Sequence, residues 1–101
     1  MRCKVELRDK AASFLRHNCT DAEVNAFYET LQRVRADPFE YSVALSDPSV
    51  SRYMLRCFRF GVTGMAVIQF NPARELVRVI ECRRLPPRPA PGSAAKAEPE
   101  A

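Results

Sequence analysis

Three apolar runs of strand length follow one another in the second half of the chain. They read RYMLRCFRF, MAVIQFN and LVRVIEC, over residues 52–60, 65–71 and 76–82, and the segments GVTG and NPARE separate them. Val, Ile, Phe, Tyr and Leu dominate the runs, and none contains a proline, which is typical of β-strands. Glycine and proline mark the intervening turns. This pattern predicts a three-stranded antiparallel meander, with the most continuously apolar run, residues 65–71, at its centre.

The first half of the chain changes to a helical pattern. The segment CKVEL alternates apolar and polar residues and predicts a short first strand. Asp9 is expected to cap a helix that begins at Lys10 and reads KAASFLRHN. Residues 20–23, TDAE, form a capping box and open a second helix, which Pro38 ends. The apolar residues of this helix recur at spacings of three and four: Val24, Phe27, Tyr28, Leu31 and Val34.

These elements predict one α+β domain over residues 1–85. We expect two N-terminal helices packed on one face of a small antiparallel sheet of about four strands. Residues 39–51 show no clear period and are expected to form an irregular connection. Residues 86–101, PPRPAPGSAAKAEPEA, lack the large apolar side chains that offset the entropy of ordering, so we predict a disordered Pro/Ala-rich tail.

Charge adds the first functional indication. The chain has 101 residues and a formal charge of +4, so it is a basic protein, although its 28% of charged residues is ordinary. From Arg52 to Arg84 there are seven arginines against two glutamates. Such a surplus attracts phosphate groups or acidic protein segments without specifying which. Alternation along a strand places Arg52 and Arg56 on one face and Arg59 on the other.

The sequence favours neither a membrane protein nor a metalloprotein. No apolar run has the length of a membrane span and the N-terminal segment has no secretory apolar core, so we expect a cytoplasmic protein without a membrane partner. The four cysteines match no zinc spacing, and we expect free thiols, no metal and no cofactor. They are Cys3, Cys19, Cys57 and Cys82. A contact between Cys57 and Cys82 on neighbouring strands is left open.

The order of the elements resembles that of the RelE/ParE superfamily of bacterial type II toxins, over residues 24–85. The helix AFYETLQRVRADP is similar to the family's second helix, and YMLRCFRFG to its strand of alternating arginine and apolar residues before a glycine turn. AVIQFNPARELVRVIECRRL looks like its last two strands, which end in a basic pair. The resemblance implies a RelE/ParE-like α+β fold.

The resemblance also implies activities and partners. RelE-like members enter the ribosomal A site and cleave messenger RNA, whereas ParE-like members inhibit DNA gyrase. Both kinds are neutralised by an antitoxin protein that wraps the toxin. For this chain it implies growth inhibition as part of a toxin-antitoxin system, with a cognate antitoxin as partner. The target is either the ribosome with its mRNA or DNA gyrase, and a homodimer is a further expectation.

Two catalytic positions carry over from the family, and two others are missing. Arg56 occupies the position of a basic residue on the first meander strand, and Arg84 that of the arginine on the terminal strand. The family often has an arginine at the start of the next strand, where this chain reads Gly64-Met65-Ala66-Val67. A catalytic tyrosine often follows the last strand, where Leu85 and two prolines stand here. Activity as a ribosome-dependent endoribonuclease is therefore left open.

Elementary chemistry favours binding over catalysis. Cleavage of RNA through its own 2′-hydroxyl needs a base, an acid and cationic stabilisation of the charge on phosphorus, and arginine supplies only the last. His17 lies on the first predicted helix, and Tyr53 titrates near neutrality only with a strongly shifted pKa. We predict a cationic surface for phosphate or an acidic protein, formed by Arg52, Arg56, Arg83 and Arg84. The predicted binding residues also include Tyr53, Arg59 and Arg78.

Three functions remain compatible with the sequence. The first is a toxin that cleaves ribosome-bound RNA, the second a toxin of the same fold that binds gyrase or another protein, and the third a non-toxic binding or regulatory protein. The missing arginine and tyrosine favour the second and third, whereas the arginine-rich strands favour the first two. We predict a toxin and leave its target open.

Overall fold

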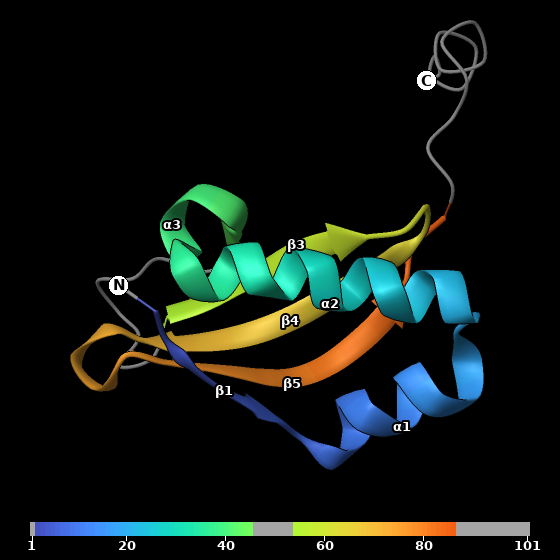
Figure 1. Cartoon of the computed structure of the whole chain (residues 1–101), viewed down its shortest axis with the longest axis horizontal. Helices are drawn as coiled ribbons and strands as arrows, with labels where there is room; N and C mark the ends of the chain where they lie inside the picture. The colour runs from blue at the N-terminus through green and yellow to red at the C-terminus, as the bar shows by residue number, and fades with distance from the viewer. Residues whose placement is uncertain (1, 46–53, 87–101) are drawn as a thin grey trace, which may run out of the picture.

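The computed structural model describes residues 2–45 and 54–86 of the chain, and Figure 1 shows the arrangement of its elements. In order, the helices and strands are β1 (Lys4–Leu7), α1 (Asp9–Asn18), α2 (Asp21–Ala36), α3 (Pro38–Tyr41), β2 (Val43–Ala44), β3 (Met54–Phe60), β4 (Gly64–Asn71), the 3₁₀ turn η1 (Pro72–Arg74) and β5 (Leu76–Arg84). This is the predicted α+β class. Beyond Pro86, the predicted tail lies outside the described residues.

The strands form one sheet in the order β1-β5-β4-β3-β2. Strands β3, β4 and β5 are the predicted antiparallel meander, with β4 at its centre. The sheet has five strands rather than four, and it is mixed, because β1 runs parallel to β5 with Val5 opposite Val77. Strand β2 is only two residues long, so no period marked it in the sequence.

The sequence predicted the start of α2 correctly but not that of α1. The capping box of α2 is present: the Thr20 hydroxyl accepts from the Glu23 N–H at 3.1 Å, and the Glu23 carboxylate accepts from the Thr20 N–H at 2.9 Å. The prediction that Asp9 caps α1 was wrong, because Asp9 is already the first helical residue and Arg8 holds the cap position. The third helix was missed, since Pro38 ends α2 and also opens this extra turn, capped by the Asp37 side chain.

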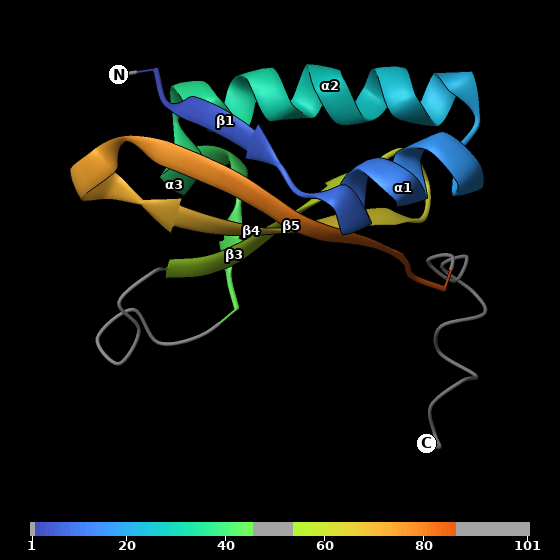
Figure 2. The same ribbon diagram turned by 90° about the horizontal axis from the view of Figure 1, so that it is seen from below.

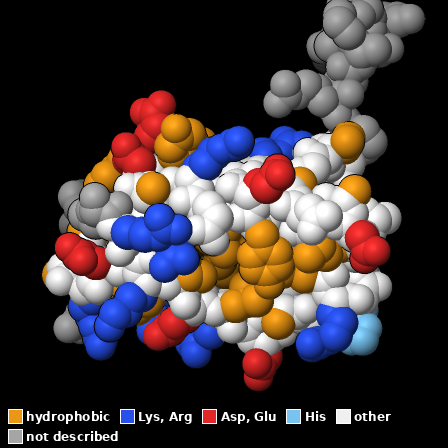
Figure 3. Space-filling model, in the orientation of Figure 1, with side chains coloured by type: hydrophobic (Ala, Val, Ile, Leu, Met, Phe, Trp, Pro, Cys, Tyr) orange, Lys and Arg blue, Asp and Glu red, His pale blue; other side chains and the backbone are white. Residues whose placement is uncertain are grey.

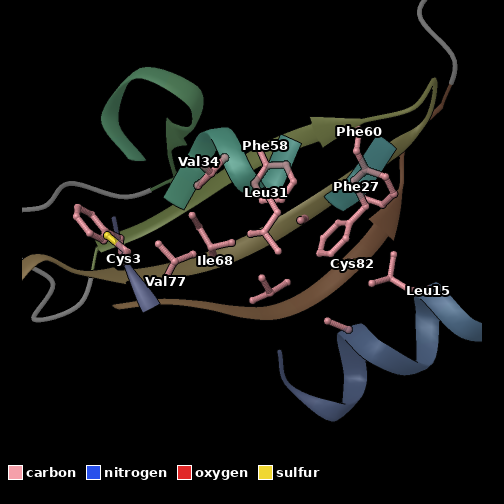
Figure 4. Packing of buried hydrophobic residues seen from close by; sticks show 14 residues of the cluster. Cys3, Leu15, Phe27, Leu31, Val34, Phe58, Phe60, Ile68, Val77 and Cys82 are labelled. Carbon is pink, nitrogen blue, oxygen red and sulfur yellow. The ribbon is translucent and has the colours of Figure 1, made fainter. Parts of the chain in front are cut away.

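Both long helices lie on one side of the sheet (Figure 2). The predicted stripe of α2 packs on it, with Phe27, Leu31 and Val34 buried. Figure 4 shows Phe27 among the side chains of β3, where its ring lies 5.8 Å from that of Phe58 and 5.3 Å from that of Phe60. The helices therefore cover one face of the sheet and leave the other without a helix among the described elements.

Two local features shape the meander. The turn after β3 is tight: Gly61 has φ +61°, and the backbone of Gly64 passes so close to the Phe60 ring that a Cβ there would lie 2.6 Å from it. A register shift between Val67 and Ile68 leaves one extra residue of β5 in the ladder, which is a β-bulge. Because of this bulge, Val79 and Cys82 both point into the core although they are three residues apart.

Candidate functional site

The face of the sheet without helices is the candidate site, and we call it the open face. Its side chains come from alternate positions of β3, β4 and β5, because successive residues of a strand point to opposite sides. The strand register places the following residues on it: Leu55, Cys57, Arg59, Met65, Val67, Gln69, Arg78, Glu81 and Arg83. Three of the predicted binding residues, Arg59, Arg78 and Arg83, therefore share this face.

Arg59 and Arg83 form one row across the open face. Both are paired in register with Met65 of the central strand, which puts them two strand spacings, about 10 Å, apart. Arg59 is exposed, and its Nη2 donates to the Val62 carbonyl at 3.2 Å. Arg83 is exposed as well and forms an ion pair with Glu81. Among the ion pairs of the described residues, none engages Arg59.

The carboxylate of Glu81 is shared by two cations. Lys10 at the start of α1 contacts it at 2.9 Å, and Arg83 contacts its second oxygen. Hydrogen bonds from Lys10 and then Arg83 hold the pKa of Glu81 below its usual range. Together with Arg59, this end of the open face has three positive charges and one negative charge, so it retains a positive excess toward solvent.

Arg78 differs from the other two arginines because it has a carboxylate of its own. Its Nε donates to Glu6 of β1 at 2.8 Å, and this bond lowers the pKa of Glu6. Ion pairs at a protein surface are weak and open readily. The Arg78–Glu6 pair as a whole nevertheless carries no net charge. Arg78 therefore adds less than Arg59 or Arg83 to the positive excess of the open face.

Arg56 lies on the other face of the sheet. Its side chain points to the same side as the core residue Phe58, and the residue is only 7% exposed. Its Nε donates to the Ser42 hydroxyl at 2.6 Å and its Nη2 to the Ser42 carbonyl at 2.8 Å. The guanidinium also lies 5.1 Å from the centre of the Phe39 ring. These contacts tie β3 to the segment containing α3 and β2.

Arg84 also points to the helix side, because it follows Arg83 on the same strand. It forms two bonds to the Glu23 carboxylate, one to the Thr63 hydroxyl at 2.7 Å and one to the Asn18 carbonyl. Its guanidinium lies 5.8 Å from the centre of the Phe14 ring. The residue therefore joins the end of β5 to the α1–α2 junction.

The structure thus divides the predicted cationic surface. Arg56, Arg83 and Arg84 do not form one surface, since Arg83 points to the open face and the other two point to the helix side. Arg52 and Tyr53 lie outside the described residues, so their assignments stay predictions. The catalytic roles of Arg56 and Arg84 also stay predictions, although their donors are engaged by protein groups.

Sequence reasoning missed the apolar centre of the open face. Val43, Cys57 and Val67 form a row across β2, β3 and β4, and Val67 is only 6% exposed. The alternation of Cys57 with Phe58 was the signal, since the two must point to opposite faces. The same alternation, with β4 between their strands, separates Cys57 from Cys82, so these thiols are not neighbours.

The side of the sheet covered by helices carries a cleft. Figure 3 shows apolar side chains gathered there with charged ones around them. A shallow cleft of about 410 Å³ lies between α1, α2 and the end of β1. Its lining is formed by Leu7, Ala12, Leu15, Arg16, Cys19, Asp21, Val24 and Tyr28. Exposed His17 is on the same helix as Leu15, far along the sequence from the arginine strands.

The described residues contain no cluster of potential metal ligands. Among them, no group of three His, Cys, Asp or Glu side chains lies close enough together to hold a metal ion. No described helix has the length and apolar character needed to cross a membrane. Glu81 lies on the open face, and Lys10 and Arg83 lower the pKa of its carboxyl group. It is therefore a weaker base than an ordinary glutamate. This arrangement is suited to binding anions.

Comparison with known proteins supports the fold. No protein family model matches the chain, and no curated protein matches its sequence. The structure is similar to a chain in the crystal structure of the archaeal RelE-RelB complex from Pyrococcus horikoshii OT3, with a TM-score of 0.70 and 14% sequence identity. The match covers 83% of this chain and 96% of that one. At this identity the likeness shows a RelE-like fold.

Proposed function

We propose that the protein is the growth-inhibiting member of a toxin-antitoxin pair and acts by binding a phosphate-bearing target through its open face. The observation that carries the proposal is the Arg59–Arg83 row on the helix-free face of a RelE-like sheet. Arginine presents a planar fork of donors that fits phosphate oxygens, and the two side chains are exposed. The similar structure is described as a RelE-RelB complex, which supports a protein partner for this chain too.

Binding is favoured over cleavage by the state of the two carried-over catalytic arginines. Arg56 is buried against Ser42, and Arg84 holds Glu23, so each would have to break protein contacts to reach a phosphate. Stabilisation of a transition state requires donors that are already directed at the developing charge. Arg59 and Arg83 are exposed, and their contacts are with the Val62 carbonyl and with Glu81, so they are free enough to bind a phosphate. They cannot move protons, because arginine stays charged.

The proposal is tested by inducible expression in a bacterial host. Wild-type protein is expected to stop growth, and the double variant Arg59→Glu/Arg83→Glu is expected to abolish the effect, because it reverses the charge of the row. The control is Arg33→Glu, on the exposed side of α2, which should remain toxic. Arg35 is left unchanged in this control, because its side chain donates a hydrogen bond to the Cys3 carbonyl. Equal toxicity of the double variant and wild type would refute the assignment of the open face.

The target is identified by two assays on the purified protein. Primer extension on a reporter mRNA in a translation extract detects breaks that depend on translating ribosomes, and a supercoiling assay detects gyrase inhibition. Translation arrest with intact messenger is the result that the open face supports best, because it requires binding alone. Codon-phased breaks would instead assign catalysis, and Arg56 and Arg84 would then be the first residues to replace.

A non-toxic binding protein is the second candidate. The observation that favours it is the engagement of Arg56 and Arg84 in contacts that hold the fold together. In that case expression leaves growth unchanged, while the protein still binds a small acidic protein if a neighbouring reading frame encodes one. Co-purification of the two proteins, together with an unaffected growth curve, selects this function over the first.

A further inference from the structure

Three charged side chains meet where helix α1 lies against strand β5 (Figure 1). Lys10 near the start of α1 and Arg83 of β5 both contact the carboxylate of Glu81, which lies two residues before Arg83 on the same strand. The Lys10 Nζ lies 2.9 Å from Oε1 of Glu81, and the Arg83 Nε donates to Oε2. Each oxygen of this carboxylate therefore binds its own cation.

The two cations are far more exposed than the carboxylate between them. The side chains of Lys10 and Arg83 are 77% and 60% exposed, whereas that of Glu81 is only 16% exposed. Arg83 uses its Nε for Glu81, and its Nη1 and Nη2 have no acceptor among the hydrogen bonds of the described residues. The Lys10 ammonium also keeps donors in reserve, because an ammonium carries several N–H groups. Both side chains can therefore turn toward solvent while the carboxylate stays close to the sheet.

The contacts of Glu81 indicate which anion this pair of cations can bind. They show that one group with two neighbouring anionic oxygens contacts Lys10 and Arg83 at the same time. A backbone phosphate offers two such oxygens, and the donor fork of a guanidinium fits them. Ion pairs between exposed side chains contribute little stability, so the contacts of Glu81 are readily exchanged for those of an incoming anion.

We propose that Lys10 and Arg83 form a binding site for a backbone phosphate of RNA, in which Glu81 is the resident counter-anion that the phosphate displaces. RNA is favoured over an acidic protein segment because its phosphates carry condensed cations, whose release on neutralisation contributes to binding. A partner's carboxylate lacks this contribution and has the same charge and shape as Glu81, which is already in place. The bound strand runs from Arg59 past Arg83 to the start of α1.

The inference rests on the proposed function, because it adds Lys10 to the phosphate-binding surface of the open face. Fluorescence anisotropy of the full chain with a single-stranded RNA oligonucleotide tests it. Lys10→Ala is expected to weaken binding about threefold, since it removes a phosphate contact, and Glu81→Gln to strengthen binding about threefold, since it removes the competing charge. Arg16→Ala is the matched control: it removes a positive charge from the exposed surface of the same helix and should bind like wild type.

A double-mutant cycle separates displacement of Glu81 from attraction by the overall charge. Glu81→Gln should bring no gain in affinity when Lys10→Ala and Arg83→Ala are already present, because the contacts that the phosphate exchanges are then absent. An equal gain in both backgrounds would overturn the inference, since it would reveal only the change in overall charge.

Three other results would also overturn the inference. If Lys10→Ala binds like wild type while Arg59→Ala binds more weakly, the proposed function stands but Lys10 is not part of the site. If a glutamate-rich peptide displaces the labelled oligonucleotide at a lower concentration than unlabelled RNA does, the site takes acidic protein segments instead. If wild type binds no RNA, the open face does not bind RNA phosphates, and the inference fails with that part of the proposed function.

Discussion

Arg84 near the end of β5 holds Glu23 in the first turn of α2 with both arms of its guanidinium. The distance from Nη1 to Oε2 is 2.8 Å and that from Nη2 to Oε1 is 2.9 Å. The same carboxylate accepts the Thr20 N–H of the capping box. Arg84, to which the resemblance assigns a catalytic role, therefore also joins strand β5 to the start of helix α2. Loss of this contact has measurable effects on stability.

The first prediction concerns acid stability. Contacts from Arg84, and then the Thr20 N–H, lower the pKa of Glu23 from 4.5 to about 2. Ionised Glu23 therefore stabilises the fold fully above pH 4.5, and this contribution is lost as the pH falls through about 2. Thermal unfolding between pH 7 and pH 2 should show a smaller acid-induced loss of stability in Glu23→Gln than in wild type. Glu29→Gln, exposed on the same helix, should keep the wild-type profile.

The second prediction separates the two arginines of β3. Arg56→Ala should lower the free energy of unfolding by about 1–3 kcal/mol, because the buried Ser42 groups lose their donors. Arg59→Ala should change it by no more than about 0.5 kcal/mol, since the side chain is exposed. Urea denaturation measures both. A wild-type stability for Arg56→Ala would mean that Ser42 finds other partners.

The third prediction concerns the turn between β3 and β4. A Cβ on Gly64 would lie 2.6 Å from the Phe60 ring and 2.8 Å from the Phe60 carbonyl oxygen. Gly64→Ala should therefore cost about 1–3 kcal/mol of unfolding free energy. Combined with Phe60→Leu, which removes part of the ring, the loss should be smaller than the sum of the two single losses. Strict additivity would exclude the clash as the cause.

The fourth prediction concerns the salt dependence of RNA binding. If Arg59 and Arg83 each neutralise one phosphate of single-stranded RNA, each change to Ala should reduce the slope of log K against log salt by about 0.7. Arg33→Ala, on the exposed side of α2, should leave the slope unchanged. Fluorescence anisotropy with an oligonucleotide between about 50 and 200 mM salt provides the data. Identical slopes for all three variants would place the RNA elsewhere.

The fifth prediction concerns the thiols. Burial, with smaller effects of Cys19 and Glu81, raises the pKa of Cys82 to about 12, whereas Cys57 is partly exposed on the open face. Iodoacetamide at pH 8 should therefore label Cys57 well before Cys82, as read by mass spectrometry. In denaturant the two should react alike. Rapid labelling of Cys82 in the folded protein would show that β5 opens locally.

Local chemistry explains which elements the sequence predicted. The Thr20–Glu23 capping box and the apolar stripe of α2 specify that helix within a few turns of chain, and Gly61 and Pro72 mark the turns of the meander. Alternation along β3 is also enough to place Arg56 and Arg59 on opposite faces. The candidate site was predicted only in part, because a pattern of charges does not reveal which ones already have partners.

The sequence by itself determined the α+β class, the long helix α2 and the antiparallel meander, because these depend on periods and caps between residues close in the chain. The tertiary structure decided that β1 runs parallel to β5, that β2 is the last strand in the order of the described sheet, and that Arg84 meets Glu23 across 61 residues. It also decided that Arg56 is buried while Arg59 and Arg83 share a face. Such contacts depend on how distant segments pack, and no local period encodes them.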